Sequence, residues 1–416
     1  MLYNDYMRVA IVGAGASGLM CACMISDAHS VVVFDKNAET GKKLVMTGNR
    51  RCNVTNLVEP SEFLESVPQN AQFVASALNK FTPRDTVTFL DRIGIKIHME
   101  QGSRIFPVSG GGATVRQSMQ DFAMARGVQF VFDSVVSAVS KISGEFVLEL
   151  LGSDATYKFD IVIIATGGVS FPVTGSSGDG FAFAASFGHE IVPPRPGLCG
   201  LQLEKSAGFQ GTVVSCAVEI VDANFVALTK RYNGDMLFTK NGVSGPVIYT
   251  LTSQFKQQSI RGNFLQINFV PTIGSEQLEK RFSQLLKENA QKKPFYLVRK
   301  FVPQNVANWL VELANLPRTK NCAQLIAAER DRLFLAIKQA RVQVKDFEDI
   351  ANATVTRGGV DVSMVDYETM ESKIIPGLFF IGEVLDVDGL CGGFNLQIAF
   401  STAVACAKRI NDLSGV

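Results

Sequence analysis

A short apolar run, a glycine-rich turn and a second apolar run follow one another near the start of the chain. The run "RVAIV" leads into "GAGASG", and the segment "SGLMCACMISDA" has the apolar content of a buried helix. The following "SVVVFD" is rich in β-branched residues, which favour strands. The pattern predicts a strand, a tight turn, a helix and a second, parallel strand.

Two later segments extend this pattern to the far end of the chain. The runs "DIVIIATGG" at 160–168 and "GLFFIGEV" at 377–384 each read as a buried strand that ends in small residues. A helix is expected to begin near 392–395. Because similar strands open and close the sequence, we predict an α/β domain in two parts, residues 1–195 and 351–416.

The middle of the chain follows different patterns. Short β-like runs fill residues 196–272, namely "LQLEKS", "TVVSCAVEIV", "FVALTKRY" and "GNFLQINFV". Helical periodicity dominates residues 273–350, in "SEQLEKRFSQLLKENA", "PQNVANWLVELANL" and "AERDRLFLAIKQARV". The turn-forming "PPRPG" at 193–197 marks the exit from the first domain. We therefore predict an inserted β-rich domain over 196–272 and an inserted helical domain over 273–350.

The first turn has the spacing of a dinucleotide-binding motif. Gly13 permits the sharp turn, Gly15 lets the backbone approach a pyrophosphate, and Gly18 lets helix and strand pack closely. The positive end of the helix then faces the phosphates. Asp35, at the end of the second strand, can accept hydrogen bonds from ribose hydroxyls and would repel a 2′-phosphate. The adenosine half should therefore belong to NAD or FAD rather than NADP.

The stretch "GKKLVMTGNRRCNVTN" at 41–56 favours FAD over NAD. Its lysines can offset phosphate charge, and Arg51, Asn53 and Asn56 offer donors and acceptors for a ribityl chain and a flavin edge. The expected cofactor-binding residues, with "ATGG" and the residues around 382 and 393 included, are Gly13, Gly15, Ala16, Ser17, Gly18, Asp35, Lys36, Lys42, Lys43, Gly48, Arg51, Cys52, Asn53, Val135, Ala165, Thr166, Gly167, Gly382, Glu383, Gly393, Phe394, Asn395 and Leu396.

The chain resembles the BaiN/RdsA-like family of NAD(P)/FAD-dependent oxidoreductases, flavoproteins of the glutathione-reductase-type superfamily. The matching pieces include "VGAGASGLM", "SRIFPVSGGGATV", "ATGGVSFPVTGSSGDG" and "TRGGVDVSMVDYETMESKIIPGLFFIGEVLDVDGLCGGFNLQIAFS". The resemblance implies non-covalent FAD, a split Rossmann-type domain and an insertion with a β-barrel part and a helical part. The family's loop usually reads Ser-Gly-Gly-Gly-Arg-Cys-Asn, whereas Asn49 and Arg50 replace two of those glycines here. Their side chains could alter the backbone or project toward the flavin.

Composition and charge narrow the remaining choices. The eight cysteines form no C-x-x-C and no Cys/His cluster, so we expect neither a disulfide framework nor a metal site. Residues 201–350 carry a net charge of +7 and the rest of the chain −6, which suits a polyanionic substrate or simply a solvated surface. With no membrane span, no secretory signal and no stable protein partner indicated, we expect a cytoplasmic protein.

We expect FAD reduced by NAD(P)H to pass hydride to an electron-poor C=C bond. The chain shows no second strand–GxGxxG–helix unit, so NAD(P)H should act as a transient co-substrate. Family members are linked both to small conjugated carbonyl compounds and to a uracil ring in ribosomal RNA, and both substrates stay open. An amine or aminoketone oxidase and a non-catalytic flavin-binding sensor are the alternatives. Cys52 and Cys391 are candidate proton donors, although packing is the simpler explanation of both.

Overall fold

The computed structural model describes residues 6–255, 259–317 and 319–413. The chain divides into two compact units. Unit 1 holds the described residues up to Gly197 and from Ile350 onward, and unit 2 is Leu198–Asp349. This division places all but residues 196, 197 and 350 of the ranges 196–272 and 273–350 in one unit, so a domain boundary between the two ranges stays a prediction.

Unit 1 is built on a parallel sheet of five strands. In spatial order these are β19 (Leu378–Phe380), β10 (Ile161–Ile164), β1 (Arg8–Val12), β2 (Ser30–Phe34) and β6 (Gln129–Val131). Val12 lies in register with both Ile164 and Phe34. The segments that follow these strands therefore meet at one edge of the sheet, where ligands of open parallel sheets bind.

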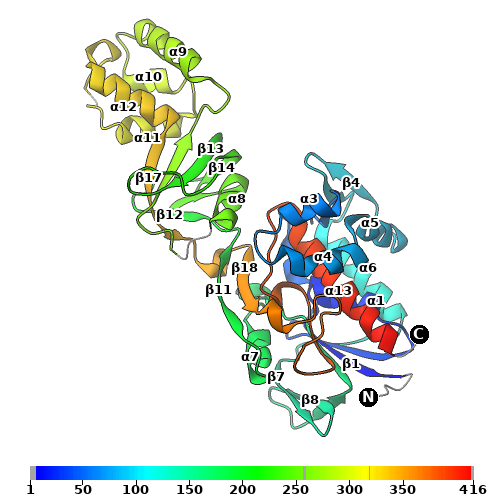
Figure 1. Ribbon diagram of the computed structural model, residues 1–416. Coiled ribbons are helices and arrows are strands. Elements are labelled where there is room, and N and C mark those ends of the chain that lie inside the picture. The colour runs from blue at the N-terminus through cyan, green and yellow to red at the C-terminus, as the bar shows by residue number, and fades with distance from the viewer. Residues whose placement is uncertain (1–5, 256–258, 318, 414–416) are drawn as a thin grey trace. The chain divides into compact units, whose positions relative to one another are not determined.

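Helices and a small antiparallel sheet cover the central sheet (Figure 1). Helix α1 (Ala16–Met24) packs on β1 and β2, and it also contacts α6 (Gly111–Ala125) and the long α13 (Phe394–Leu413). On β1 and β10 pack strands of a meander, β7 (Val136–Ile142), β8 (Glu145–Leu150) and β9 (Thr156–Phe159). All residues of β10 are buried because other elements cover the strand on both faces. This agrees with the apolar run "IVII", which predicts a buried strand.

Unit 1 also contains two smaller sets of strands and several further helices. The strands form a three-stranded sheet, β3 (Thr55–Asn56), β5 (Arg104–Pro107) and β4 (Ile97–Glu100), and a pair, β11 (Ile191–Gly197) and β18 (Val355–Val360). The further helices include α2 (Lys42–Met46), α3 (Pro60–Glu65), α4 (Ala71–Lys80), α5 (Pro83–Arg92), α7 (Asp179–Ser186) and the short 3-10 helix η5 (Gly382–Val384).

Unit 2 contains a closed barrel and a group of helices. The barrel strands, in order around it, are β12 (Leu201–Leu203), β15 (Gly242–Ser244), β14 (Tyr232–Phe238), β13 (Val213–Val221), β16 (Phe264–Asn268) and β17 (Ala340–Phe347). The helices are α8 (Pro246–Gln254), α9 (Ser275–Glu288), α10 (Pro294–Val298), α11 (Gln304–Leu313) and α12 (Ala327–Lys338). Strand β17 comes from the segment expected to be helical and closes the barrel between β12 and β16.

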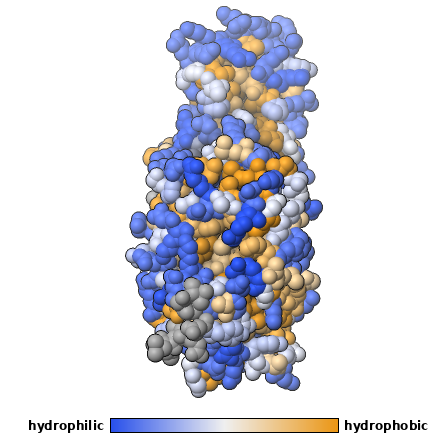
Figure 2. Space-filling view, turned by 90° about the vertical axis from the view of Figure 1, so that its right-hand side faces the viewer, coloured by the Kyte–Doolittle hydropathy of each residue, from blue (hydrophilic) through white to orange (hydrophobic). Residues whose placement is uncertain are grey.

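The barrel and the helices of unit 2 share one hydrophobic core. Trp309 on α11 contacts the rings of Phe238 and Phe269 edge to face, at centroid distances of 5.4 and 6.3 Å. The outer surface of unit 2 over α9–α12 is largely hydrophilic (Figure 2). The amphipathic pattern of α9 and α11 thus reflects burial of one face against this core.

One predicted strand of this unit is wrong. The run "FVALTKRY" at 225–232 is mostly irregular, and before Tyr232 its strand pairing is limited to an isolated bridge between Ala227 and Val221. The carboxylate of Asp222 accepts hydrogen bonds from the backbone N–H groups of Asn224 and Val226, and this local bonding competes with strand pairing. The fold class itself, a split Rossmann-type α/β domain with an inserted barrel and helices, is confirmed.

Candidate functional site

The three glycines of the motif lie in three different environments. Gly13 adopts a φ of 107°, and a Cβ there would lie 2.5 Å from the Ala165 carbonyl oxygen. A Cβ on Gly18 would overlap the Gly13 carbonyl oxygen. At Gly15, by contrast, φ is −72° and an added Cβ meets no protein atom within 4 Å. Neither backbone nor packing requires glycine at position 15, and the open space beside it leaves room for a group outside the protein.

The first helix begins directly beside this turn. Ala16 and Ser17 begin the first turn of α1. The N-cap residue is Gly15, which has no side chain to cap the helix. Ser17 also packs on the C-terminal part of unit 1, since a Cβ on Gly382 would lie 2.5 Å from its hydroxyl oxygen. The backbone N–H groups in the first turn of α1 are thus left to a ligand or to water, as at other anion-binding helix N-termini.

Asp35 follows β2 and is held by the turn itself. Its Oδ2 accepts a hydrogen bond from the Ala14 backbone N–H at 2.7 Å, and its Oδ1 accepts two from Asn37 at 2.8 and 2.9 Å. Oδ2 therefore keeps acceptor capacity for a hydroxyl group. Val135 lies close by, because the preceding Ser134 donates its backbone N–H to the Asp35 carbonyl oxygen at 3.0 Å.

The expected lysines differ in what they contact. Lys36 forms an ion pair with Asp179 and a hydrogen bond with Ser177. Lys43 forms an ion pair with Glu383. Lys42, the first residue of α2, makes no ion pair or side-chain hydrogen bond with the described residues. Since α2 starts where Gly41 donates its backbone N–H to the Ala14 carbonyl oxygen at 2.8 Å, Lys42 is the better candidate for a phosphate contact.

The loop from 48 to 52 is held in the left-handed region. Gly48, Asn49, Arg50 and Cys52 have φ values of 56°, 55°, 69° and 62°. Asn49 and Arg50 are exposed, so they retain the backbone for which the family uses glycine and point their side chains outward. This conformation costs a non-glycine residue roughly 1–2 kcal/mol, less for asparagine.

The glycines of "SGGGATV" explain how this loop is supported. The Gly112 backbone N–H donates to the Arg50 carbonyl oxygen at 3.1 Å, and a Cβ on Gly111 would overlap the same oxygen. Arg51 turns away and forms a two-pronged ion pair with Glu100, at 2.7 and 3.3 Å, over the ring of Phe106. The sequence predicts that Arg51 contacts the flavin, and in this structure its guanidinium pairs with Glu100; the flavin contact stays a prediction.

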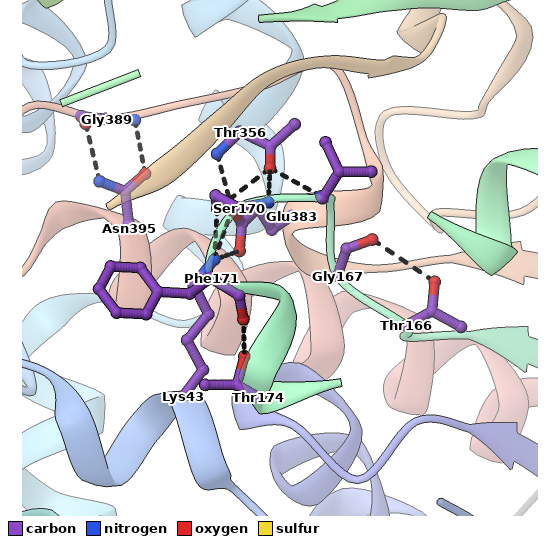
Figure 3. A network of polar contacts seen from close by, with 11 residues as sticks. Lys43, Thr166, Gly167, Ser170, Phe171, Thr174, Thr356, Glu383, Gly389 and Asn395 are labelled. Carbon is purple, nitrogen blue, oxygen red and sulfur yellow. Dashed lines mark hydrogen bonds and ion pairs between the residues drawn. The ribbon is translucent and has the colours of Figure 1, made fainter. Parts of the chain in front are cut away.

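Glu383 is the centre of a polar network at the carboxyl edge of the sheet (Figure 3). Lys43 Nζ donates to both of its oxygens, at 2.9 and 2.8 Å, and the Thr356 backbone N–H donates to Oε1 at 2.7 Å. The Ser170 hydroxyl donates to Oε1 at 3.1 Å. The network joins α2, the "ATGG" loop, β18 and η5. Ser170 and Thr356 lie in two segments that resemble the family, but the sequence assigns neither of them to the expected site.

The "ATGG" loop runs between this network and the first turn. The Ala165 backbone N–H donates to the Val12 carbonyl oxygen at 2.9 Å, and Gly167 has a φ of 72°. A Cβ on Gly168 would overlap the Thr356 hydroxyl. Thr166 forms only a weak contact, with its hydroxyl 3.5 Å from the Gly167 carbonyl oxygen (Figure 3). The small residues of the motif are thus explained by close approach of the chain segments.

The start of α13 is brought against the 52–56 segment. The Asn56 side-chain amide donates to the Gly392 carbonyl oxygen at 3.0 Å. A Cβ on Gly393 would lie 2.9 Å from Asn53 Oδ1. Asn395 closes the loop before the helix, accepting from the Gly389 N–H at 2.8 Å and donating to the Gly389 carbonyl oxygen at 2.7 Å (Figure 3).

The next residues of α13 are placed by packing. Phe394 is buried with its ring edge to face against Phe63 at a centroid distance of 5.0 Å, and Leu396 is half-buried. The buried amide oxygens Oδ1 of Asn53 and Asn56 have no hydrogen-bond partner among the described residues. Such acceptors are costly to bury alone, so they suit a donor group on a ligand.

The two candidate proton donors differ in access. Cys52 is fully buried, and burial raises the pKa of its thiol to about 11. Cys391 is exposed, and partial desolvation raises the pKa of its thiol while the charge of Arg104 opposes the rise. Of the two, only Cys391 can exchange its proton readily with solvent.

Taken together, these residues fit a dinucleotide with a flavin. They provide an open glycine position at a helix N-terminus, a carboxylate with acceptor capacity after β2, and unpartnered amide oxygens near the start of α13. Within the described ranges, no group of three or more His, Cys, Asp or Glu side chains could hold a metal ion. No helix among the same residues is both long and apolar enough to cross a bilayer.

The fold and the site are those of the class of Rossmann-type flavoenzymes. The profile of the HI0933-like protein Rossmann domain matches residues 7–409. The chain therefore belongs to the HI0933-like family of FAD-dependent oxidoreductases, and the predicted family and enzyme class are confirmed.

Two curated relatives match over nearly their whole length. The ribosomal RNA dihydrouridine synthase of Escherichia coli is 32% identical, with 96% of this chain and 97% of that protein covered. The 3-dehydro-bile acid delta(4,6)-reductase of Clostridium scindens is 29% identical, with 96% and 98% covered.

Among solved structures, two steroid dehydrogenases share the fold. The 3-ketosteroid-delta4-(5alpha)-dehydrogenase from Rhodococcus jostii RHA1 has a TM-score of 0.51 at 13% identity, with 97% of this chain and 96% of that chain covered. The 3-ketosteroid delta1-dehydrogenase from Sterolibacterium denitrificans has a TM-score of 0.52 at 12% identity, with 98% and 100% covered. At these identities the likeness shows the fold alone.

Proposed function

We propose that the chain is an FAD-dependent reductase that adds two hydrogens to a C=C bond conjugated with a carbonyl group, and that its substrate is a uracil ring in ribosomal RNA. The observation that carries the proposal is the 32% identity, over nearly the full length of both chains, to a protein named for dihydrouridine synthesis. The bile acid reductase, by its name, reduces double bonds in a 3-oxo compound. Both names describe the same class of reaction.

The residues at the carboxyl edge of the sheet would hold FAD in three places. The turn from Gly13 to Gly18 and the N-terminus of α1 suit the pyrophosphate, with Lys42 nearby. The free acceptor capacity of Asp35 suits the adenosine ribose. Segment 52–56 and the start of α13 suit the flavin end, where a helix N-terminus stabilises negative charge.

Once bound, FAD would serve as the hydride carrier between NAD(P)H and the substrate. The protein's part is to position, to exclude water and to supply a proton. The exposed thiol of Cys391 is the candidate proton donor, because the buried thiol of Cys52 holds its proton far more tightly. NAD(P)H is proposed to visit the same site transiently.

A ribosomal RNA substrate is favoured over a small enone by charge. Residues 201–350 carry 20 basic and 13 acidic side chains. A net positive segment attracts the phosphate backbone independently of sequence and makes binding sensitive to salt. A small conjugated ketone remains the second candidate, supported by the bile acid reductase.

The direct test removes the gene from its host and measures dihydrouridine in the ribosomal RNA by mass spectrometry of nucleosides. We expect dihydrouridine to disappear and to return when purified protein, FAD and NADPH or NADH are added to RNA from the deletion strain. Unchanged dihydrouridine in the deletion strain would reject RNA as the substrate.

Two further assays separate the other classes of function. Anaerobic NADH or NADPH should bleach the visible flavin bands, and a flavin that stays oxidised with both would support a binding or sensor role. Rapid oxygen uptake with an amine, without bleaching by a nicotinamide, would instead support an amine oxidase.

A further inference from the structure

Two arginines and two aspartates form a largely buried cluster beside the Glu383 network. Arg195 on β11 and Arg357 on β18 are directly opposed residues of an antiparallel pair. Asp386 and Asp388 belong to the loop that follows Glu383. With Gln69, which contacts both arginines, these side chains are called the arginine cluster.

β18 ties the cluster to the candidate flavin site. Thr356, which donates its backbone N–H to Glu383, directly precedes Arg357. The Asp386 backbone N–H donates to the Val360 carbonyl oxygen at 3.0 Å, which fastens the loop to the same strand. That loop continues to Asn395 and the start of α13, so the arginine cluster lies on the segment that leads to the proposed flavin end.

The arginine cluster leaves most of its hydrogen-bonding capacity unused. The two guanidinium groups share one acceptor, Gln69 Oε1, at 3.4 Å from Arg195 and 3.5 Å from Arg357. Arg357 Nε lies 3.3 Å from Asp388 Oδ1, yet neither atom makes a directed hydrogen bond within the described residues. Each guanidinium has five N–H donors, and both oxygens of Asp388 also lack a hydrogen-bond partner among the described residues, so donors and acceptors of the cluster lie close together with few directed hydrogen bonds between them.

Such an arrangement is expensive unless a ligand completes it. The side chains of Arg357 and Asp388 are only 7% and 0% exposed. Directly opposed like charges on paired strands are destabilising, and burial together with the charge of Arg357 lowers the pKa of Arg195. Arg195 is only partly buried, so a ligand can reach the pair from its side.

The charge balance indicates the kind of ligand. Burial raises the pKa of Asp388 to about 6, so this carboxyl is mostly ionised at neutral pH, and with Asp386 it offsets the two arginines. A balanced cluster suits a neutral carbonyl oxygen that gains negative charge during the reaction better than it suits a permanent phosphate. Donors fixed in advance at such an oxygen are the usual means of stabilising a transition state.

We propose that Arg195 and Arg357 bind the carbonyl oxygen of the substrate and stabilise the enolate that forms on it, with Asp388 as a positioning residue for Arg357. The inference rests on the proposed function. Bound FAD, with a nicotinamide as reductant, would supply the hydride that forms a C–H bond at the β-carbon. The electron pair of the C=C bond moves toward the carbonyl, whose oxygen becomes anionic. A proton, for which the exposed Cys391 thiol is the candidate donor, then forms the second C–H bond at the α-carbon, and the C=O bond is restored.

The test uses stable oxyanions that mimic this enolate. Barbiturate is a pyrimidine that exists as an enolate near neutral pH, and 4-nitrophenolate is a planar conjugated oxyanion of non-pyrimidine type. Calorimetric titration of the FAD-loaded protein measures their binding without turnover. The variants are Arg195→Lys and Arg357→Lys, which keep the charge but lose the planar fork. Arg8→Lys, at the amino end of β1 where Arg8 pairs with Asp160, is the matched control.

We expect each cluster variant to weaken binding of at least one oxyanion by roughly 10- to 100-fold, since charge-assisted hydrogen bonds are lost. Binding of neutral 5,6-dihydrouracil should change much less, and Arg8→Lys should change neither. The thermal midpoint of each variant shows whether it is folded. If Arg357→Lys does not fold, Arg195→Lys decides the outcome.

Three results would overturn the inference. They are failure of both oxyanions to bind the wild-type protein, equal binding by the wild type and both lysine variants, and displacement of the oxyanions by inorganic phosphate that binds more tightly. Each of these can occur while ribosomal RNA still gains dihydrouridine and nicotinamides still bleach the flavin. Failure of the inference is therefore distinguishable from failure of the proposed function.

Discussion

At the scale of single residues, the motif glycines separate the needs of the fold from those of a ligand. Gly13 and Gly18 are explained by a positive φ and by close packing, respectively. Gly15 has neither reason, and its backbone conformation is open to any residue. A contact-free glycine in an ordinary conformation is therefore the most informative single position of the site.

Two alanine substitutions test this separation. Gly15→Ala should leave the free energy of unfolding of the FAD-free protein nearly unchanged and weaken FAD binding by roughly 10-fold or more, because the added methyl group occupies the approach of the pyrophosphate. Gly18→Ala should instead destabilise the FAD-free protein by about 1–3 kcal/mol, as overpacking does. Urea unfolding and fluorescence titration with FAD measure the two effects. Wild-type FAD affinity in Gly15→Ala would contradict the account.

At the scale of elements, α13 depends on a buried polar network as well as on apolar packing. Gln397 Oε1 accepts hydrogen bonds from the hydroxyls of Thr55 and Thr86 at 2.6 and 2.7 Å. Its amide nitrogen donates to the Phe81 carbonyl oxygen at 3.1 Å and to Ser401 at 3.0 Å. The network fixes the helix against β3 and α5, next to the segment that contacts Gly392.

Replacing Gln397 with leucine should therefore destabilise unit 1. The substitution leaves two buried hydroxyls without their acceptor, so we expect a loss of about 2–4 kcal/mol in the free energy of unfolding. Gln117→Leu, on the exposed side of α6, is the matched control and should stay within about 0.5 kcal/mol of the wild type. Equal midpoints of urea unfolding for the two variants would show that the network contributes little.

The elements also show where sequence reasoning reaches its limit. Strands β1, β2, β10 and β19 could be predicted, because buried parallel strands are nearly continuous apolar runs. The run 225–232 could not be recognised as irregular from its β-branched and aromatic residues, since the competing hydrogen bonds come from Asp222 outside it. Strand β17 could not be predicted within the helical segment 273–350, because the helical pattern of α12 continues to within two residues of that strand.

The site divides in the same way. The glycine motif, Asp35 and the start of α13 could be found from spacing, because local chain geometry dictates them. Ser170, Thr356 and the pair Arg195 and Arg357 could not. Ser170 and Thr356 meet Glu383 only because the chain returns to the sheet after unit 2, and Arg195 meets Arg357 only through the pairing of β11 with β18. The engagement of Arg51 by Glu100 likewise depends on β4, which lies far along the chain.

At the scale of the whole molecule, unit 1 is assembled from both ends of the sequence. β19 completes the sheet begun by β1, and the residues around 392 contact those around 56. A site made this way exists only when the polypeptide on both sides of unit 2 is folded together. The central claim is that this assembly binds one FAD molecule per chain.

The most direct measurement is the visible spectrum of purified protein after incubation with excess FAD and removal of unbound cofactor. The account predicts a yellow protein with the flavin absorbance bands and one FAD per chain, and loss of that colour in Gly15→Ala under the same treatment. A folded wild-type protein that remains colourless would contradict the account.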